Sequence, residues 1–508
     1  MKLMDKLWGR FLSFRDKHPR FSSWSGRYGI FVIVLFFILL YCMISLLKHM
    51  NWASHGWDLG IFDQYIWQLS RFELGYNTVR LVPSLLGDHF HLIFIFVAPT
   101  FWIWSDARML LIVQAIVVGL GAIPVFYVVR YALKSNFCAL CMALTYLLFW
   151  GTMELIFFDF HELAFAGPIL ALSYFFIQRD KWVGFFLTIP FLLMIKETMA
   201  FVVIFLGIYV VISKRKWFEG VTTTLIAVGW FYVVTQRIMP ALSTGGTYFY
   251  FKYYSDLGKN FTSAGIHLLT HPWKIITLSF VPLHKTKLLL YLFVPFLFIP
   301  FLGLFAIVAL PPLYEHLLSN YYPHWEILRH YHAIFAPIFI FACIEAFPRI
   351  HRFLIKRGRP MDYRKMVFAL CVAILVMQIP FTFSRSAKTL FDPNFYSLDP
   401  RMEQTGYDII SMIPPDASVC AQDPVVPHLT HRDYIYQYDG STYNAEYVII
   451  NKFLDCYPFT NRVLVYEMDK LYKDPRYIAH HFGYGWVLFT IKPEYDIEGK
   501  LQPLPEAI

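Results

Sequence analysis

The chain has 508 residues, of which 57% are hydrophobic, 19% aromatic and only 16% charged. Soluble proteins carry about 25% charged residues, and the apolar runs here reach about 15 to 25 residues, the length that a helix needs to cross a bilayer. These values exclude a series of soluble domains and a disordered chain, and seven cysteines are too few for a disulfide scaffold. The composition predicts a polytopic α-helical membrane protein.

The net charge of +9 is concentrated in two basic blocks. The first contains Lys2, Lys6, Arg10, Arg15, Lys17, Arg20 and Arg27, and the second contains Arg349, Arg352, Lys356, Arg357, Arg359, Arg364 and Lys365. Because both blocks adjoin apolar runs, the positive-inside rule explains them better than nucleic-acid binding does. We therefore expect a cytoplasmic N-terminus, a first span that is retained rather than cleaved, and no nucleic-acid partner.

With both blocks on the cytoplasmic side, the spans can be assigned in chain order. We predict them at about 28–47, 107–130, 136–151, 163–178, two within 182–213, 219–239, two within 288–310, 330–347 and 366–383. This gives about eleven spans in a transmembrane domain of residues 1–383, with outside loops at 48–106, 152–162, 240–286 and 311–329. The apolar stretch 91–104 is short for a crossing and predicts a helix at the interface.

From residue 384 the composition changes to alternating short strands and helix-like stretches. Strands are predicted at 417–421, 434–438, 446–451 and 486–491, and a helix is predicted at 467–480. Residues 384–508 therefore predict a small α/β domain outside the membrane.

Acids and histidines gather on the predicted outside face, where ionisable residues close to spans are candidates for function. Asp58 follows the first span, between glycines and beside Trp57. A carboxylate there could act as a general base toward an acceptor, or it could cap a helix that begins near Leu59. Asp63 in the same loop and Asp159 in the next are the other candidate catalytic acids.

Two groups of side chains in these loops could hold a divalent cation such as Mg²⁺ or Mn²⁺. The first is Asp88, His89 and His91, our candidate metal site, and the second is Asp159, His161 and Glu162. A cation would neutralise a phosphate or pyrophosphate leaving group. None of the spacings is a recognised metal signature, and interfacial histidines bonded to the backbone are the alternative.

The remaining candidates would bind substrate, and His161 and Glu162 are candidates for this role as well. Lys196 and Glu197 lie between two apolar segments, where they could seal a turn as an ion pair or present a lysine to a phosphate. Arg329 and His332, at the start of a later span, allow the same two interpretations, and a planar guanidinium suits a phosphate group.

The order of these features resembles an uncharacterised prokaryotic family of predicted membrane proteins. The resemblance rests on short motifs distributed over nearly the whole chain: Trp57-Asp58-Leu59-Gly60-Ile61-Phe62-Asp63-Gln64, Gly87-Asp88-His89-Phe90-His91, Phe160-His161-Glu162, Lys196-Glu197, Tyr331-His332 and Pro427-His428-Leu429. That family in turn is similar to the GT-C superfamily of glycosyltransferases, which use sugars linked to polyprenyl phosphates. The resemblance implies an acid in the first outside loop that acts as base, here Asp58, and a second acid in the next loop, here Asp159. Residues 159–162 lack the Asp-x-Asp of better-known branches, which puts metal dependence in doubt.

We therefore expect a membrane glycosyltransferase of the cell envelope, inverting, that transfers sugar from a polyprenyl-phosphate donor to a lipid, glycan or protein acceptor outside the cytoplasmic membrane. The alternatives are a non-enzymatic transporter or flippase of lipid-linked saccharides and a structural partner in envelope assembly. A transporter would place polar groups along a path at mid-bilayer. The enzyme hypothesis requires Asp58, Asp159 and Glu197 to surround one cavity that opens outside.

Overall fold

The computed structural model describes residues 8–10, 12–13, 19–246, 248–359, 361–383, 386–396 and 399–495. Lys2, Lys6, Arg15 and Lys17 of the first basic block lie outside these residues, as does the predicted outer domain after residue 495.

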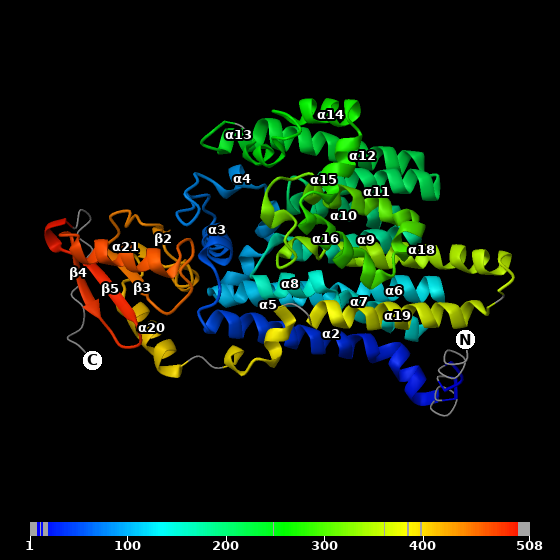
Figure 1. The fold of residues 1–508 in the computed structure, drawn as a ribbon, viewed down its shortest axis with the longest axis horizontal. Coiled ribbons are helices and arrows are strands. Elements are labelled where there is room, and N and C mark those ends of the chain that lie inside the picture. The colour runs from blue at the N-terminus through cyan, green and yellow to red at the C-terminus, as the bar shows by residue number, and fades with distance from the viewer. Residues whose placement is uncertain are drawn as a thin grey trace.

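Helices α2 to α19 form a bundle, and residues 399–495 form a domain at one end of it (Figure 1). The helices of the bundle are α2 (Pro19–Met50), α3 (Ile61–Ser70), α4 (Leu85–Asp88), α5 (Ala107–Leu120), α6 (Ala122–Leu133), α7 (Asn136–Leu148), α8 (Trp150–Phe158), α9 (Ala166–Gln178), α10 (Trp182–Ile195), α11 (Met199–Lys214), α12 (Trp217–Val233), α13 (Met239–Leu242), α14 (Phe261–Thr270), α15 (Trp273–Phe280), α16 (Leu283–Phe293), α17 (Leu310–Leu317), α18 (Phe335–Lys356) and α19 (Tyr363–Phe383). The start of α2 and the turn from α18 to α19, which carry basic residues, lie at the end of the bundle away from the domain (Figure 1).

Apolar helices long enough to cross a membrane occur at five places in the described residues. They are Tyr28–Met50, Ala107–Leu133, Trp217–Leu242, His330–Lys356 and Tyr363–Phe383. The number rises to seven if each of two bent helix pairs counts as one span. The predicted spans between residues 163 and 213 correspond to apolar helices shorter than 18 residues, so the count of eleven is not confirmed.

The predicted pair of crossings at 288–310 is a broken segment. Helix α16 ends at Phe293 and is followed by three short 3₁₀ helices, η7 (Val294–Phe296), η8 (Ile299–Leu302) and η9 (Leu304–Ala309). Pro295 and Pro300 lack the N–H that a continuous helix needs. The break also frees backbone N–H groups, and the carboxylate of Glu345 in α18 supplies an acceptor for one of them: it accepts the N–H of Phe305 at 2.8 Å and the Tyr209 hydroxyl at 2.5 Å.

The apolar stretch at 91–104, predicted as an interface helix, is helical from Leu92 to Trp102. The stretch forms two 3₁₀ helices, η2 (Leu92–Phe96) and η3 (Ala98–Trp102). Pro99 lies in the first turn of η3. A proline is tolerated there, because the N–H groups of a first turn have no partner within the helix.

The domain contains one mixed five-stranded sheet with helices α20 (Pro400–Met412) and α21 (Asn461–Lys473). Its strands are β1 (Val419–Ala421), β2 (Ile435–Gln437), β3 (Tyr447–Asn451), β4 (Tyr477–His481) and β5 (Trp486–Ile491), in the order β2-β1-β3-β5-β4. Strand β1 is parallel to β2 and β3, whereas β5 is antiparallel to β3 and β4. The helix predicted at 467–480 ends earlier, at Lys473. The next residue, Asp474, precedes Pro475, and a residue before proline avoids helical geometry. Strand β4 follows.

The domain packs against the loop that was predicted at 48–106, through hydrogen bonds to its backbone and to Thr78. Gly56 donates its N–H to the Asp423 carbonyl at 3.0 Å, and Trp57 donates to the Asp423 carboxylate at 3.2 Å. Thr78 both donates to and accepts from the backbone of Ile435 in β2. A Cβ on Gly56 would lie 2.8 Å from the Val426 side chain, so the contact needs glycine. The domain therefore fixes the loop that carries Asp58.

Candidate functional site

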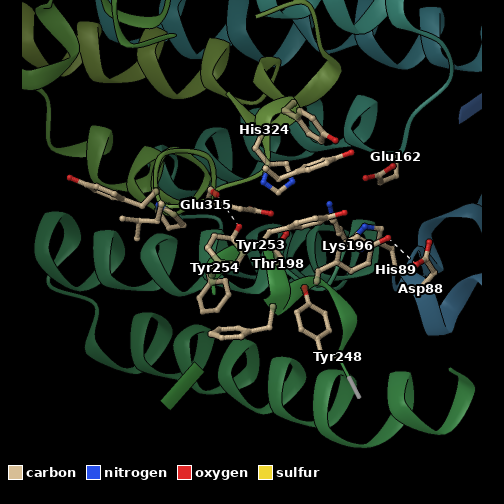
Figure 2. Close-up of a pocket in the computed structure, with 18 of the residues that line it drawn as sticks. Asp88, His89, Glu162, Lys196, Thr198, Tyr248, Tyr253, Tyr254, Glu315 and His324 are labelled. Atoms are coloured by element: carbon tan, nitrogen blue, oxygen red, sulfur yellow. Dashed lines mark hydrogen bonds between the residues drawn. The ribbon is translucent and has the colours of Figure 1, made fainter. Parts of the chain in front are cut away.

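A cavity of about 660 Å³ lies where the loop at 48–106 meets the segments around residues 196–205, 248–268 and 310–331. Figure 2 shows Lys196, Glu162, Glu315 and His324 around this cavity. The polar lining comes mainly from the loops, and apolar lining comes from helices: Phe201 and Phe205 from α11, and Ala264 and Leu268 from α14. A cavity with both kinds of wall can hold a molecule that has a polar head and an apolar chain.

Asp58 lines the cavity from a single π-helical turn, η1 (Gly56–Gly60). Burial raises its pKa from 3.8 to about 6; nearby His161 opposes this rise and Asp159 adds to it. The side chain keeps 20% of its surface exposed. The capping alternative fails, because the N-cap of α3 is Gly60 and that of η1 is His55. A carboxylate with a pKa in this range is suited to general base catalysis near neutral pH.

His161 lies between Asp58 and a second carboxylate. Its Nε2 is 4.0 Å from an Asp58 oxygen, and its Nδ1 is 2.5 Å from an oxygen of the fully buried Glu162. The ring of His330 stacks on that of His161 with centroids 3.4 Å apart. Within the described residues, both ring nitrogens of His330 and Oε1 of Glu162 are buried without a hydrogen-bond partner. Buried polar atoms in this state are ready to bind a polar ligand.

Glu197, a predicted substrate-binding residue, does not line the cavity. The break between α10 and α11 brings it to His89 Nδ1 at 2.9 Å and the Tyr248 hydroxyl at 2.9 Å. Its other oxygen accepts the N–H of Phe90 at 3.1 Å. The carboxylate thus joins three segments that form the cavity wall.

Lys196 does line the cavity, and its side chain is 9% exposed. Among the described residues, no hydrogen bond or ion pair to its ammonium group is present. Burial disfavours the charge, but the carboxylates of Glu315, Glu162 and Glu197 outweigh it and raise the pKa of Lys196. A charged, unpaired ammonium group in a cavity can bind a phosphate oxygen.

The predicted metal residues Asp88, His89 and His91 do not converge. The Asp88 carboxylate accepts hydrogen bonds from Arg80 at 3.0 Å and from the Tyr250 hydroxyl at 2.9 Å. His89 contacts a glutamate, and Nδ1 of His91 lies 3.2 Å from a backbone carbonyl oxygen. Because a guanidinium already neutralises Asp88, these three residues do not fit a divalent cation.

Asp159 and Asp63 do not line the cavity either. Asp159 is buried, pairs with Lys48 at 3.0 Å and accepts the N–H of His55 at 3.1 Å. Asp63 is fully buried against the domain and lies 3.1 Å from His431 Nε2. These acids therefore hold the loop and the domain in place, and neither occupies the catalytic position predicted for it.

Of the residues predicted at the start of α18, Arg329 and His332 stand behind the cavity wall. Arg329 pairs with Glu326 at 2.9 Å, and His332 Nε2 lies 3.0 Å from the Glu326 carbonyl oxygen. The residues between them, His330 and Tyr331, line the cavity.

The condition set for the enzyme hypothesis is met only in part, because Asp58 lines the cavity whereas Asp159 and Glu197 do not. Asp159 lies close enough to raise the pKa of Asp58, and Glu197 close enough to raise that of Lys196. Tyr248 was not predicted from the sequence as a site residue, although it lines the cavity and donates a hydrogen bond to Glu197. The high density of tyrosines around it in the sequence could have indicated it.

The comparisons with known proteins agree with this description. The family described as Predicted membrane protein (DUF2079) matches residues 48–470, so the chain belongs to this family of membrane proteins. No curated protein matches the chain.

Among solved structures, the chain is similar to ArnT from Cupriavidus metallidurans bound to undecaprenyl phosphate, with 12% identity, a TM-score of 0.50, and coverage of 91% of this chain and 98% of that one. The apo state of the same ArnT matches with 11% identity, a TM-score of 0.45, and coverage of 90% and 98%. The first similarity shows that the chain shares its fold with this ArnT.

Proposed function

We propose that this member of the DUF2079 family is a membrane glycosyltransferase that transfers a sugar from a polyprenyl-phosphate donor to an acceptor outside the cytoplasmic membrane. The observation that carries the proposal is the cavity, which combines a carboxylate of raised pKa, an ammonium group without a hydrogen-bond partner among the described residues, and apolar walls.

Asp58 is the proposed base. In its ionised form it takes the proton from an acceptor hydroxyl while the acceptor oxygen forms a bond to the anomeric carbon. The bond from that carbon to the phosphate oxygen breaks, and the carrier phosphate leaves with the electron pair. Attack from the face opposite the phosphate inverts the anomeric centre. His161, 4.0 Å from Asp58 and 2.5 Å from Glu162, favours the ionised form of Asp58 through its charge.

Lys196 is the proposed phosphate-binding residue, because its ammonium group is charged, buried and unpaired within the described chain. Negative charge grows on the leaving phosphate in the transition state, so a fixed cation there lowers the barrier. No step in this scheme requires a bound metal ion.

The carrier chain would run along the apolar wall. Phe201, Phe205, Ala264 and Leu268 supply a surface without charged groups. The binding of undecaprenyl phosphate by an ArnT of similar fold supports a lipid-linked donor. We expect the bilayer to continue this wall, since α14 and α15 carry exposed Leu269 and Ile276.

The outer domain, residues 384–508, would select or position the lipid, glycan or protein acceptor. Tyr457 lies near the cavity: burial raises its pKa, and the charges of Asp423 and Asp58 add to the rise. The basic turn between α18 and α19 lies at the opposite end of the molecule (Figure 1). This separation supports a cytoplasmic N-terminus and an extracytoplasmic domain.

The test is a sugar-transfer assay with purified protein in lipid and radiolabelled polyprenyl-phosphate sugars. We expect Asp58→Asn to reduce transfer by at least about 100-fold, the usual contribution of a general base. The exposed acid Asp433 provides the matched control Asp433→Asn, which should transfer at the native rate. Equal transfer by native protein and a folded Asp58→Asn variant would remove Asp58 as the base.

A further inference from the structure

A second polar cluster lies outside the cavity, where the domain meets the first outside loop. It consists of His55, Asp423 and Asp455, each of which offers one ligand atom, and these atoms all lie within 4.8 Å of one another. Within the described part of the chain, no other group of three histidine, cysteine or acidic residues meets this condition.

The fold explains why these residues meet. Asp423 follows β1 and Asp455 follows β3, and these neighbouring strands run parallel. Residues after the carboxyl ends of parallel strands lie at one edge of a sheet, where ligands commonly bind. His55 reaches the same edge from the transmembrane part, as the residue before η1.

Contacts around the cluster fix the ligand atoms in place. The fully buried Asp423 receives the N–H of Trp57 on one oxygen. Its other oxygen shares a hydrogen bond of 2.6 Å with His55 Nδ1, which an ion bound between these two atoms would replace. One oxygen of Asp455 accepts the N–H of Tyr457 at 2.9 Å. Hydrogen bonds of this kind hold the carboxylates of metal sites in the required orientation.

The charge balance favours a cation over a simple ion pair. His55 can neutralise one carboxylate, but two are present, and two carboxylates this close repel each other unless a cation lies between them. Exposed Asp455 and half-exposed His55 leave a path for an ion from solvent. Three protein ligands also leave coordination positions for water.

We propose that His55, Asp423 and Asp455 bind one divalent transition-metal ion, such as Zn²⁺ or Mn²⁺, which clamps the outer domain to the loop that carries Asp58. An imidazole nitrogen with two carboxylates suits these ions better than Mg²⁺ or Ca²⁺, which prefer oxygen ligands only. The site is distinct from Asp88, His89 and His91, and it does not depend on the proposed transferase activity.

The experiment compares metal content and stability of tag-free, full-length protein in detergent. Native protein and Asp455→Asn are treated with chelator, equilibrated with Zn²⁺ or Mn²⁺, freed of unbound ion and analysed by mass spectrometry for bound metal. The variant keeps an oxygen that can accept the Tyr457 N–H, so it should fold. Asp469→Asn, on the exposed face of α21, is the matched control.

We expect native protein and Asp469→Asn to bind one more ion per chain than Asp455→Asn. The same ion should raise the Tm of the first two proteins and leave that of Asp455→Asn unchanged, because binding to the folded state stabilises it. Equal metal content in native protein and Asp455→Asn, for both ions, would overturn the proposal whatever the transfer activity.

Discussion

Asp58 should weaken the folded protein at neutral pH, and Asp58→Asn should therefore stabilise it. Burial raises the pKa of this carboxyl from 3.8 to about 6, so ionising it is harder in the folded state than in the unfolded state. About two pKa units at about 1.36 kcal/mol each give an upper limit of about 3 kcal/mol. Because 20% of the side chain is exposed, we expect a gain of about 1–2 kcal/mol.

The sign follows from proton binding. Between pH 3.8 and about 6 the folded state holds a proton that the unfolded state has lost, so native stability falls relative to the variant as pH rises. The stability difference should be full above pH 6 and absent below pH 3.8.

Thermal unfolding in detergent at one heating rate, at pH 8 and pH 4, measures this difference. Asp58→Asn should have the higher Tm at pH 8 and the native Tm at pH 4. Asp159→Asn is the contrasting control, because it removes the negative charge that pairs with Lys48 and should lower Tm at pH 8. A lower Tm for Asp58→Asn at pH 8, or a shift independent of pH, would refute the reasoning.

Three further results are expected. The rate of sugar transfer should rise about tenfold between pH 5 and pH 7 and then level off, as Asp58 ionises with a pKa of about 6; a flat profile would exclude it as base. Lys196→Gln should raise the Kd for polyprenyl phosphate about tenfold or more in a lipid-binding assay, through loss of a charged hydrogen bond of about 1.5–3 kcal/mol. The exposed Lys274→Gln should leave this Kd unchanged, and equal Kd values for the two variants would contradict the assignment. Asp63→Asn should weaken the contact with His431 by about 1–3 kcal/mol, seen as faster hydrogen exchange at β2, whereas native exchange would show that the contact is not important for docking.

Sequence patterns predicted those parts of the fold that depend on local composition. Strand β5 was predicted with its observed bounds, because an apolar run between turn residues defines a buried strand locally. The segment after α16 was not predicted, since Pro295 and Pro300 break the helix and distant Glu345 supplies a partner for the freed backbone.

In the site, too, features that depend on local sequence could be predicted, and those that depend on distant partners could not. Asp58 could be singled out because an acid after an apolar span is unusual by itself. The roles of Asp63 and Asp159 depend on His431 and Lys48, which are brought to them only by tertiary folding. Spacing along the chain carries no information about such partners.

The central claim is that the cavity beside Asp58 holds the phosphate of a lipid carrier. A cryo-EM structure of the protein in nanodiscs with added polyprenyl phosphate tests it most directly. We predict density for the phosphate within hydrogen-bond distance of Lys196 Nζ, and for the chain along Phe201 and Leu268. Lipid density elsewhere, with this cavity unchanged at saturating polyprenyl phosphate, would contradict the account.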